Sequence, residues 1–187
     1  MGDQEKKKKS VSFQKGELQW GLVNNTGRSV PSGSTDRMQL ENFNKVLDVN
    51  LMGVIEVTLQ FLPLLKKARG HVVNVANIVG RLSVTGGGYC LSKSCTKFFS
   101  NSLRKNRQPF GIKMTITEPG YFKTGPTQMD VIEADLRRPW NCFPQDVKDL
   151  YGETHINNYV KAYEFTINIL CSSDISKVTS HMEHGLM

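Results

Sequence analysis

The chain has 187 residues, of which 39% are hydrophobic and 22% are charged, and its formal net charge is +7 at pH 7. This composition fits one globular domain and excludes a disordered or fibrous chain. Lysines at 6–9 carry part of the charge without alternating aromatic residues, so we expect a solvated basic tail over residues 1–15 and no nucleic-acid partner. The cysteines lack C-x-x-C spacing and the histidines lack companion ligands, so we expect free thiols and no metal site.

The first apolar run, residues 20–23, predicts a buried strand that ends at Asn24 and Gly27. Residues 28–37 are rich in serine, glycine and proline, a composition typical of a loop. Helical spacing of apolar residues over 40–68 then predicts a long helix. Its most apolar window contains charged and polar side chains and a proline, which argues against a membrane span.

Strands and helices continue to alternate further along the chain. We expect a strand over 71–76, a helix over 89–104 and a strand over 112–117. This alternation indicates a parallel sheet with crossover helices, and hence an α/β protein. Residues 121–145 follow no regular pattern, and helical spacing returns over 156–186.

Tyr89 and Lys93 lie four residues apart in the predicted helix, so their side chains share one helix face. A free tyrosine has a pKa of about 10, and a nearby ammonium favours the phenolate and lowers that pKa. The pair therefore has the chemistry of a proton donor or acceptor for a hydroxyl or a ketone. From spacing alone a structural pair is the commoner interpretation, because both residue types are frequent.

Other candidate residues fall where predicted strands end. The motif at 24–27 closes the first strand, and Pro119 and Gly120, followed by Thr124, close a later one. In an open parallel sheet, ligands bind beyond the carboxyl ends of the strands. Asn50 lies in the middle of the long helix and is the remaining polar candidate.

These motifs together resemble the short-chain dehydrogenase/reductase family, and within it the retinol and hydroxysteroid dehydrogenase branch. The resemblance covers about residues 11–187. The matching positions are Asn24-Asn25-Thr26-Gly27 for the family's Asn-Asn-Ala-Gly, Tyr89 and Lys93 for its Tyr-x-x-x-Lys, Asn50 for its helix asparagine, and Pro119-Gly120 with Thr124 for its Pro-Gly-x-x-x-Thr.

The resemblance implies a partial Rossmann-like parallel sheet with flanking helices over residues 16–125, lacking the first βαβ cofactor-binding half, and a helical substrate-side segment over 126–187. It implies NAD or NADP as cofactor and a retinoid or steroid as small-molecule partner. It leaves membrane association and a homo- or hetero-oligomer open. The implied catalytic residues are Tyr89, Lys93 and Asn50, and the implied cofactor-binding residues are Asn24, Gly27, Pro119, Gly120 and Thr124.

Two departures from the family pattern bear on activity. The chain has no G-x-G-x-x-G motif, whose backbone N–H groups would bind the cofactor phosphates. Position 76 is alanine where the family has a serine that holds the substrate oxygen, and we expect neither Asn77 nor Ser83 to replace it. We therefore expect an impaired or inactive oxidoreductase. The alternative is a non-catalytic fragment or isoform that acts by pairing with an intact relative.

Two further expectations follow from the same resemblance. In the family, the strand that ends at Asn24 is flanked by strands that this chain lacks, so we expect a bare apolar sheet edge and poor solubility. The family relationship implies a location at the endoplasmic reticulum membrane, whereas the chain taken alone predicts a cytoplasmic protein.

Overall fold

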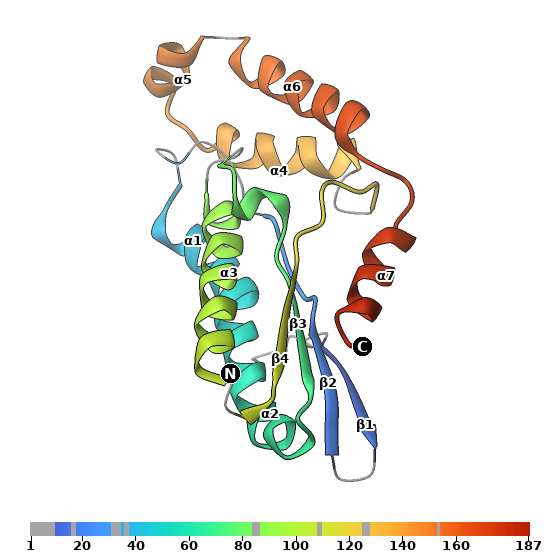
Figure 1. Ribbon diagram of the computed structural model, residues 1–187. Coiled ribbons are helices and arrows are strands. Elements are labelled where there is room, and N and C mark those ends of the chain that lie inside the picture. Colours follow the sequence, from blue (N-terminus) through green and yellow to red (C-terminus); the bar gives the residue numbers. More distant parts are fainter. Residues whose placement is uncertain are drawn as a thin grey trace.

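The computed structural model describes residues 10–15, 18–30, 35, 38–83, 87–107, 110–124, 128–152 and 154–187 (Figure 1). The strands are β1 (Ser10–Lys15), β2 (Leu18–Asn24), β3 (His71–Val75) and β4 (Lys113–Thr117). The helices are α1 (Leu40–Leu47), α2 (Gly53–Ala68), α3 (Gly88–Arg107), α4 (Met129–Asn141), α5 (Gln145–Tyr151), α6 (His155–Leu170) and α7 (Ser176–His184). A π-helical turn, η2 (Asp48–Met52), joins α1 to α2, and a 3-10 turn, η3 (Ile78–Gly80), follows β3.

The sheet has the strand order β1-β2-β3-β4. Strands β2, β3 and β4 are parallel, and Val72 in the middle strand pairs with Leu22 on one side and Met114 on the other. Helices α1 and α2 connect β2 to β3, and α3 connects β3 to β4. The predicted α/β fold with a parallel sheet and crossover helices is confirmed.

Strand β1 differs from the prediction for the N-terminal segment. Residues 10–15, which we assigned to the basic tail, pair antiparallel with β2 from Ser10 opposite Asn24 to Lys15 opposite Leu18. The edge of β2 that we expected to be bare is therefore paired. A hairpin partner satisfies backbone donors and acceptors that an open edge would leave to solvent or to another chain. The lysines at 6–9 lie outside the described residues.

Both faces of the sheet are covered. On one face, Leu22 and Val72 pack with Leu65 of α2 and Leu103 of α3. On the other face, Met182 and Leu186 of the C-terminal segment pack against valines 23, 73 and 75. Figure 1 shows α1, α2 and α3 on the first side, α7 on the second, and α4–α6 beyond the carboxyl ends of the parallel strands.

The long helix over 40–68 runs as predicted through α1, η2 and α2, with Pro63 inside α2. Its length and apolar composition also meet the requirements of a membrane span. However, Leu62 and Leu65 lie in the core against the sheet, and Leu65 is fully buried. A core position accounts for the apolar composition without a membrane.

The prediction of irregular structure over 121–145 is wrong for the second half of that range, where α4 and the start of α5 lie. Helix α4 contributes Leu136 to a small core that includes Ile156 and Val160 of α6. An ion pair between Arg137 and Glu133, one helical turn apart, supports the same helix at an N–O distance of 2.7 Å. Met129, Ile132 and Leu136 follow helical spacing in the sequence, so the prediction missed a helical signal, and packing against α6 buries that side of α4.

Candidate active site

The carboxyl ends of the parallel strands meet at one edge of the sheet, and backbone hydrogen bonds continue beyond them. The Ala76 N–H donates to the Thr117 carbonyl at 2.9 Å, and the Ile78 N–H donates to the Pro119 carbonyl at 3.0 Å. The loops after β3 and β4 therefore lie side by side. This is the edge where an open α/β sheet binds its ligand.

Asn50 links two of the segments at this edge. It lies in the π-helical turn and is 1% exposed. Its Oδ1 accepts from the Arg28 N–H at 2.8 Å, and its Nδ2 donates to the Arg28 carbonyl at 2.9 Å and to Ser92 Oγ at 2.9 Å. The amide therefore holds the loop after β2 and helix α3 together. Single π-helical turns inside α-helices are frequent at functional sites.

Lys93 reaches the same place from α3. Its Nζ donates to the Val75 carbonyl at 3.0 Å, at the end of β3. A Cβ on Gly27 would lie 3.4 Å from Lys93 Nζ and 3.5 Å from Asn50 Oδ1, so Gly27 adjoins both side chains. The structure thus brings together three of the predicted site residues. Burial lowers the pKa of Lys93 from 10.5 to about 8, because an ammonium loses its hydration inside the protein.

Tyr89 lies one helical turn before Lys93, whose Nζ is 5.8 Å from the centroid of the phenol ring. Burial is the main cause that raises the pKa of Tyr89 from 10.0 to about 12, and Tyr121 and Cys90 contribute to the same rise. The expected lowering of this pKa by the neighbouring ammonium is therefore wrong for this structure. Loss of phenolate hydration outweighs the attraction of a cation that is itself buried.

Asn24 is placed away from these residues, inside the layer between sheet and helices. Its Nδ2 donates to Asn74 Oδ1 at 2.8 Å and to Thr58 Oγ1 at 3.0 Å. Asn74 in turn donates to Ser100 Oγ at 2.8 Å. This buried network joins β2, β3, α2 and α3, so Asn24 fixes the end of β2 whether or not it also contacts a cofactor.

The remaining predicted cofactor residues follow β4. Pro119 is half-buried and its carbonyl accepts from Ile78, as described above. Gly120 is exposed, and a Cβ there would meet no atom within 4 Å. Thr124 is half-buried. Their roles toward a cofactor stay predictions.

The structure offers no replacement for the family serine among the two neighbours considered. Ala76 is 2% exposed and lies directly after β3. The Oδ1 of Asn77 accepts from the Val79 N–H at 3.1 Å and so caps the 3-10 turn. Ser83 is exposed, beyond that turn.

Two residues of the site were missed by sequence reasoning. Arg28 places its backbone on the Asn50 amide, and Ser92 is fully buried beneath Tyr89, to whose carbonyl its hydroxyl donates at 2.7 Å. Ser92 has a signal in the sequence, because it lies between Tyr89 and Lys93 and three residues after the former. For Arg28 the only signal is its place directly after Gly27.

The residues present fit a nicotinamide only in part. Gly120 leaves open space beside the strand ends, since a Cβ there would meet no atom within 4 Å, whereas a Cβ on Gly27 would already contact Lys93 Nζ and Asn50 Oδ1. The sequence provides no glycine-rich loop for the pyrophosphate. Among the residues that the structure describes, no three His, Cys, Asp or Glu side chains are grouped to hold a metal ion.

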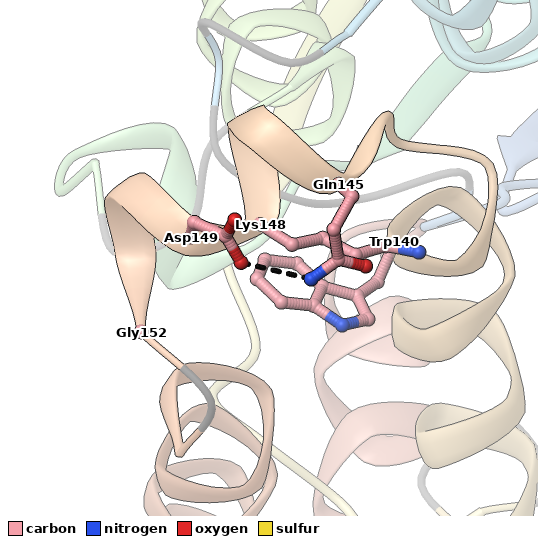
Figure 2. Close-up of a pocket in the computed structure, with 5 residues that line it drawn as sticks. All are labelled: Trp140, Gln145, Lys148, Asp149 and Gly152. Atoms are coloured by element: carbon pink, nitrogen blue, oxygen red, sulfur yellow. Dashed lines mark hydrogen bonds between the residues drawn. The ribbon is translucent and has the colours of Figure 1, made fainter.

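A separate shallow cavity of about 340 Å³ lies between α4 and α5 (Figure 2). Figure 2 shows Trp140 beside the side chains of α5, with Gln145 Nε2 donating to Asp149 Oδ1 at 2.8 Å. Lys148 and Gly152 complete its lining. No predicted site residue lines this cavity, so we do not assign it to catalysis.

Fold and site together define an α/β protein with a buried lysine, a tyrosine and an asparagine at the carboxyl edge of its sheet. The short chain dehydrogenase profile matches residues 3–134. Retinol dehydrogenase 7 of Rattus norvegicus is 52% identical over 167 residues, which are 89% of this chain and 52% of that protein. Retinol dehydrogenase 16 of Homo sapiens is 45% identical over 168 residues, which are 90% of this chain and 53% of that protein. The chain belongs to the short-chain dehydrogenase family and is similar to its retinol dehydrogenases.

Solved structures agree with this assignment. A short-chain dehydrogenase from Streptomyces avermitilis superposes with a TM-score of 0.53 at 31% identity, over 58% of this chain and 40% of that one. A short-chain dehydrogenase from Burkholderia cenocepacia in complex with NADP gives a TM-score of 0.55 at 22% identity, over 58% of this chain and 46% of that one, which shows the fold alone. The chain spans about half the length of the curated relatives it matches.

Proposed function

We propose that the chain carries the proton-transfer site of a nicotinamide-dependent oxidoreductase that acts on a retinoid or hydroxysteroid alcohol. The observation that supports this most is the convergence of Asn50, Lys93 and Gly27 at the strand ends, with Tyr89 on the adjoining helix turn. The similarity to proteins named retinol dehydrogenases supports the substrate class. Whether the cofactor is NAD or NADP stays open.

Each residue has a distinct part in this proposal. Tyr89 keeps its phenolic proton near neutral pH, because its pKa is raised to about 12, so it is poised to donate that proton to a carbonyl oxygen. Lys93, whose pKa is lowered to about 8, exchanges protons readily near neutral pH and stabilises the phenolate when it forms. Asn50 fixes the position of the loop that contains Arg28 relative to helix α3, through its hydrogen bonds to the Arg28 backbone and to Ser92. A bound nicotinamide would supply or accept the hydride.

One observation favours the alternative, a non-catalytic chain that pairs with an intact relative. Ala76 has no donor for the substrate oxygen, and Asn77 is occupied in capping the next turn. Removing one such donor typically costs about a hundred- to a thousand-fold in rate. Co-purification of the tagged chain with a full-length retinol dehydrogenase, and a change in that enzyme's turnover, would support this alternative.

The decisive experiment grafts the part of rat retinol dehydrogenase 7 that precedes its match onto residue 18, in place of β1. The experiment compares five proteins. Two lack the graft: the chain itself and its Ala76→Ser variant. Three carry it: the chimera, the chimera with Ala76→Ser, and the chimera with both Ala76→Ser and Tyr89→Phe. Retinol and a 3-hydroxysteroid serve as substrates, and nicotinamide absorbance reports turnover. Calorimetric titration with NAD and with NADP measures cofactor binding separately.

We expect the chimera to bind a nicotinamide cofactor and to show weak turnover, Ala76→Ser to raise that turnover, and Tyr89→Phe to abolish it. A chimera that binds cofactor but turns over neither substrate, with serine present, would refute the proposed activity. Activity in Ala76→Ser without the graft would show that the cofactor binds elsewhere. The family resemblance also supports a location at the endoplasmic reticulum membrane, which fractionation of cells that express the tagged chain would test.

A further inference from the structure

A partly buried carboxylate, Glu118, joins three segments at the edge of the site. It follows β4 directly and its side chain is 13% exposed. Arg81, in the turn after β3, donates from Nε to Glu118 Oε2 at 2.9 Å, and its Nη2 contacts the same oxygen. Lys97 of α3 places its Nζ 3.3 Å from Glu118 Oε1. These contacts lower the pKa of the Glu118 carboxyl, chiefly through the hydrogen bond from Arg81.

The turn that Arg81 anchors lies directly against the backbone of Lys93. A Cβ on Gly80 would lie 3.1 Å from both the carbonyl carbon and the carbonyl oxygen of Lys93. Ser94 Oγ donates to the Gly80 carbonyl at 2.9 Å and fastens the turn to α3. A movement of the turn away from α3 would therefore open the surroundings of the Lys93 backbone to water.

We propose that Glu118 is a positioning residue, which holds the turn after β3 against α3 through Arg81 and Lys97. By holding that turn closed, Glu118 keeps water away from Lys93 and preserves the hydrogen bond from the Lys93 ammonium to the Val75 carbonyl. The side-chain contacts of Glu118 are with Arg81 and Lys97, so Glu118 acts on Lys93 through the turn rather than by direct contact.

A purely stabilising role predicts something different. The Arg81 side chain is 57% exposed, and ion pairs with so exposed a partner contribute little to stability. Loss of the pair should therefore change the melting temperature little. If Glu118 positions the turn, the same loss should change the environment of Lys93 clearly.

The test measures the titration of Lys93 in the full chain without cofactor or substrate. The chain is labelled with ¹³C-lysine, Lys93 is assigned by its loss in Lys93→Arg, and the Cε shift is followed with pH. In Glu118→Gln we expect the pKa of Lys93 to rise from about 8 to above about 9, because water reaches the ammonium. Removing a negative charge alone would instead lower the pKa of an ammonium, so the sign separates hydration from direct electrostatics.

Two further variants complete the design. Arg81→Gln breaks the same contact from an exposed side chain, so it is expected to fold and to raise the Lys93 pKa; because loss of a cation also raises that pKa, the sign in Glu118→Gln decides between the two causes. Glu133→Gln removes the carboxylate of the 2.7 Å ion pair with Arg137 on α4 and should leave Lys93 unchanged. A Lys93 pKa that stays the same or falls in Glu118→Gln would overturn the inference.

The inference rests on the proposed function only for the role of Lys93 in proton transfer. The titration needs no turnover, so a positive titration with an inactive chimera would refute the oxidoreductase proposal alone. An active chimera with an unchanged Lys93 titration would refute the role of Glu118 alone.

Discussion

Replacing Asn50 by alanine tests whether one amide holds the site together. The amide makes three hydrogen bonds, two to the Arg28 backbone and one to Ser92, at 2.8–2.9 Å. A hydrogen bond contributes about 0.5–1.5 kcal/mol net, and an orphaned buried partner costs more. Alanine recovers up to about 0.7 kcal/mol through its higher helix propensity. We therefore expect Asn50→Ala to lower the free energy of unfolding by about 2–3 kcal/mol.

Urea denaturation followed by circular dichroism measures this loss. With a slope of about 1–3 kcal/mol per molar urea, the midpoint should fall by roughly 1–2 M. Asn44→Ala is the matched control, because Asn44 lies exposed on α1 of the same long helix and should change stability by no more than about 0.5 kcal/mol. Hydrogen exchange of the Arg28 amide should also accelerate in Asn50→Ala. A loss below about 1 kcal/mol with unchanged exchange would show that water satisfies Arg28 and that Asn50 does not join the loop to α3.

Three other predictions concern the sheet edge and the two titrating groups. Deleting residues 1–9 should leave the melting temperature and the elution volume in size-exclusion chromatography unchanged. Deleting residues 1–15 removes β1 and bares the edge of β2, so it should produce aggregates in the same measurement. Between pH 8 and 10.5, Lys93 holds its proton in the unfolded chain but not in the folded one, so the free energy of unfolding should rise with pH across that window. The full pKa difference corresponds to roughly 3 kcal/mol, and we expect Lys93→Met to raise the free energy of unfolding at pH 7 by about 1–2 kcal/mol of it. A lower free energy of unfolding in Lys93→Met would contradict this prediction. The Tyr89 phenol, with its pKa raised to about 12, should destabilise the fold only as pH rises through 10, and ultraviolet difference titration against Tyr89→Phe should show no phenolate from it below about pH 11.

Much of the fold follows from patterns that one element carries by itself. The strand that became β3 is a short apolar run with a glycine just before it, and the helix over 40–68 repeats apolar residues at helical spacing. The position of Gly27 follows from the same patterns, because it lies where a parallel strand ends, whereas Asn50 and Lys93 lie on helices and reach that edge only in the folded chain. The sequence alone does not provide their closeness: Lys93 Nζ lies 3.4 Å and Asn50 Oδ1 3.5 Å from the point where a Cβ on Gly27 would lie.

The failures concern features that depend on a second element. Val11 and Phe13 alternate with polar residues, which is a strand signal, but the lysine run beside them favoured a tail, and only pairing with β2 makes β1 a strand. Helix α4 depends on α6 for its apolar contacts. The predicted direction of the Tyr89 pKa shift was wrong because the burial of the phenol depends on the tertiary structure, whereas the spacing of Tyr89 and Lys93 is a local feature of the sequence.

The opposite pKa shifts at Tyr89 and Lys93 have one cause and one consequence. Burial favours the neutral form of each group, so it raises the pKa of the phenol to about 12 and lowers that of the ammonium to about 8. The Lys93 ammonium donates its hydrogen bond to a carbonyl oxygen rather than to a carboxylate, so no negative charge in that contact offsets the cost of burial. The site is therefore costly to fold, although a pKa of about 8 leaves Lys93 mostly charged at neutral pH. Any bound group that brings a positive charge beside Tyr89 would lower the phenol pKa strongly, because the dry surroundings leave that charge poorly screened. The same burial that makes the isolated tyrosine a weak acid thus makes its acidity responsive to what binds next to it.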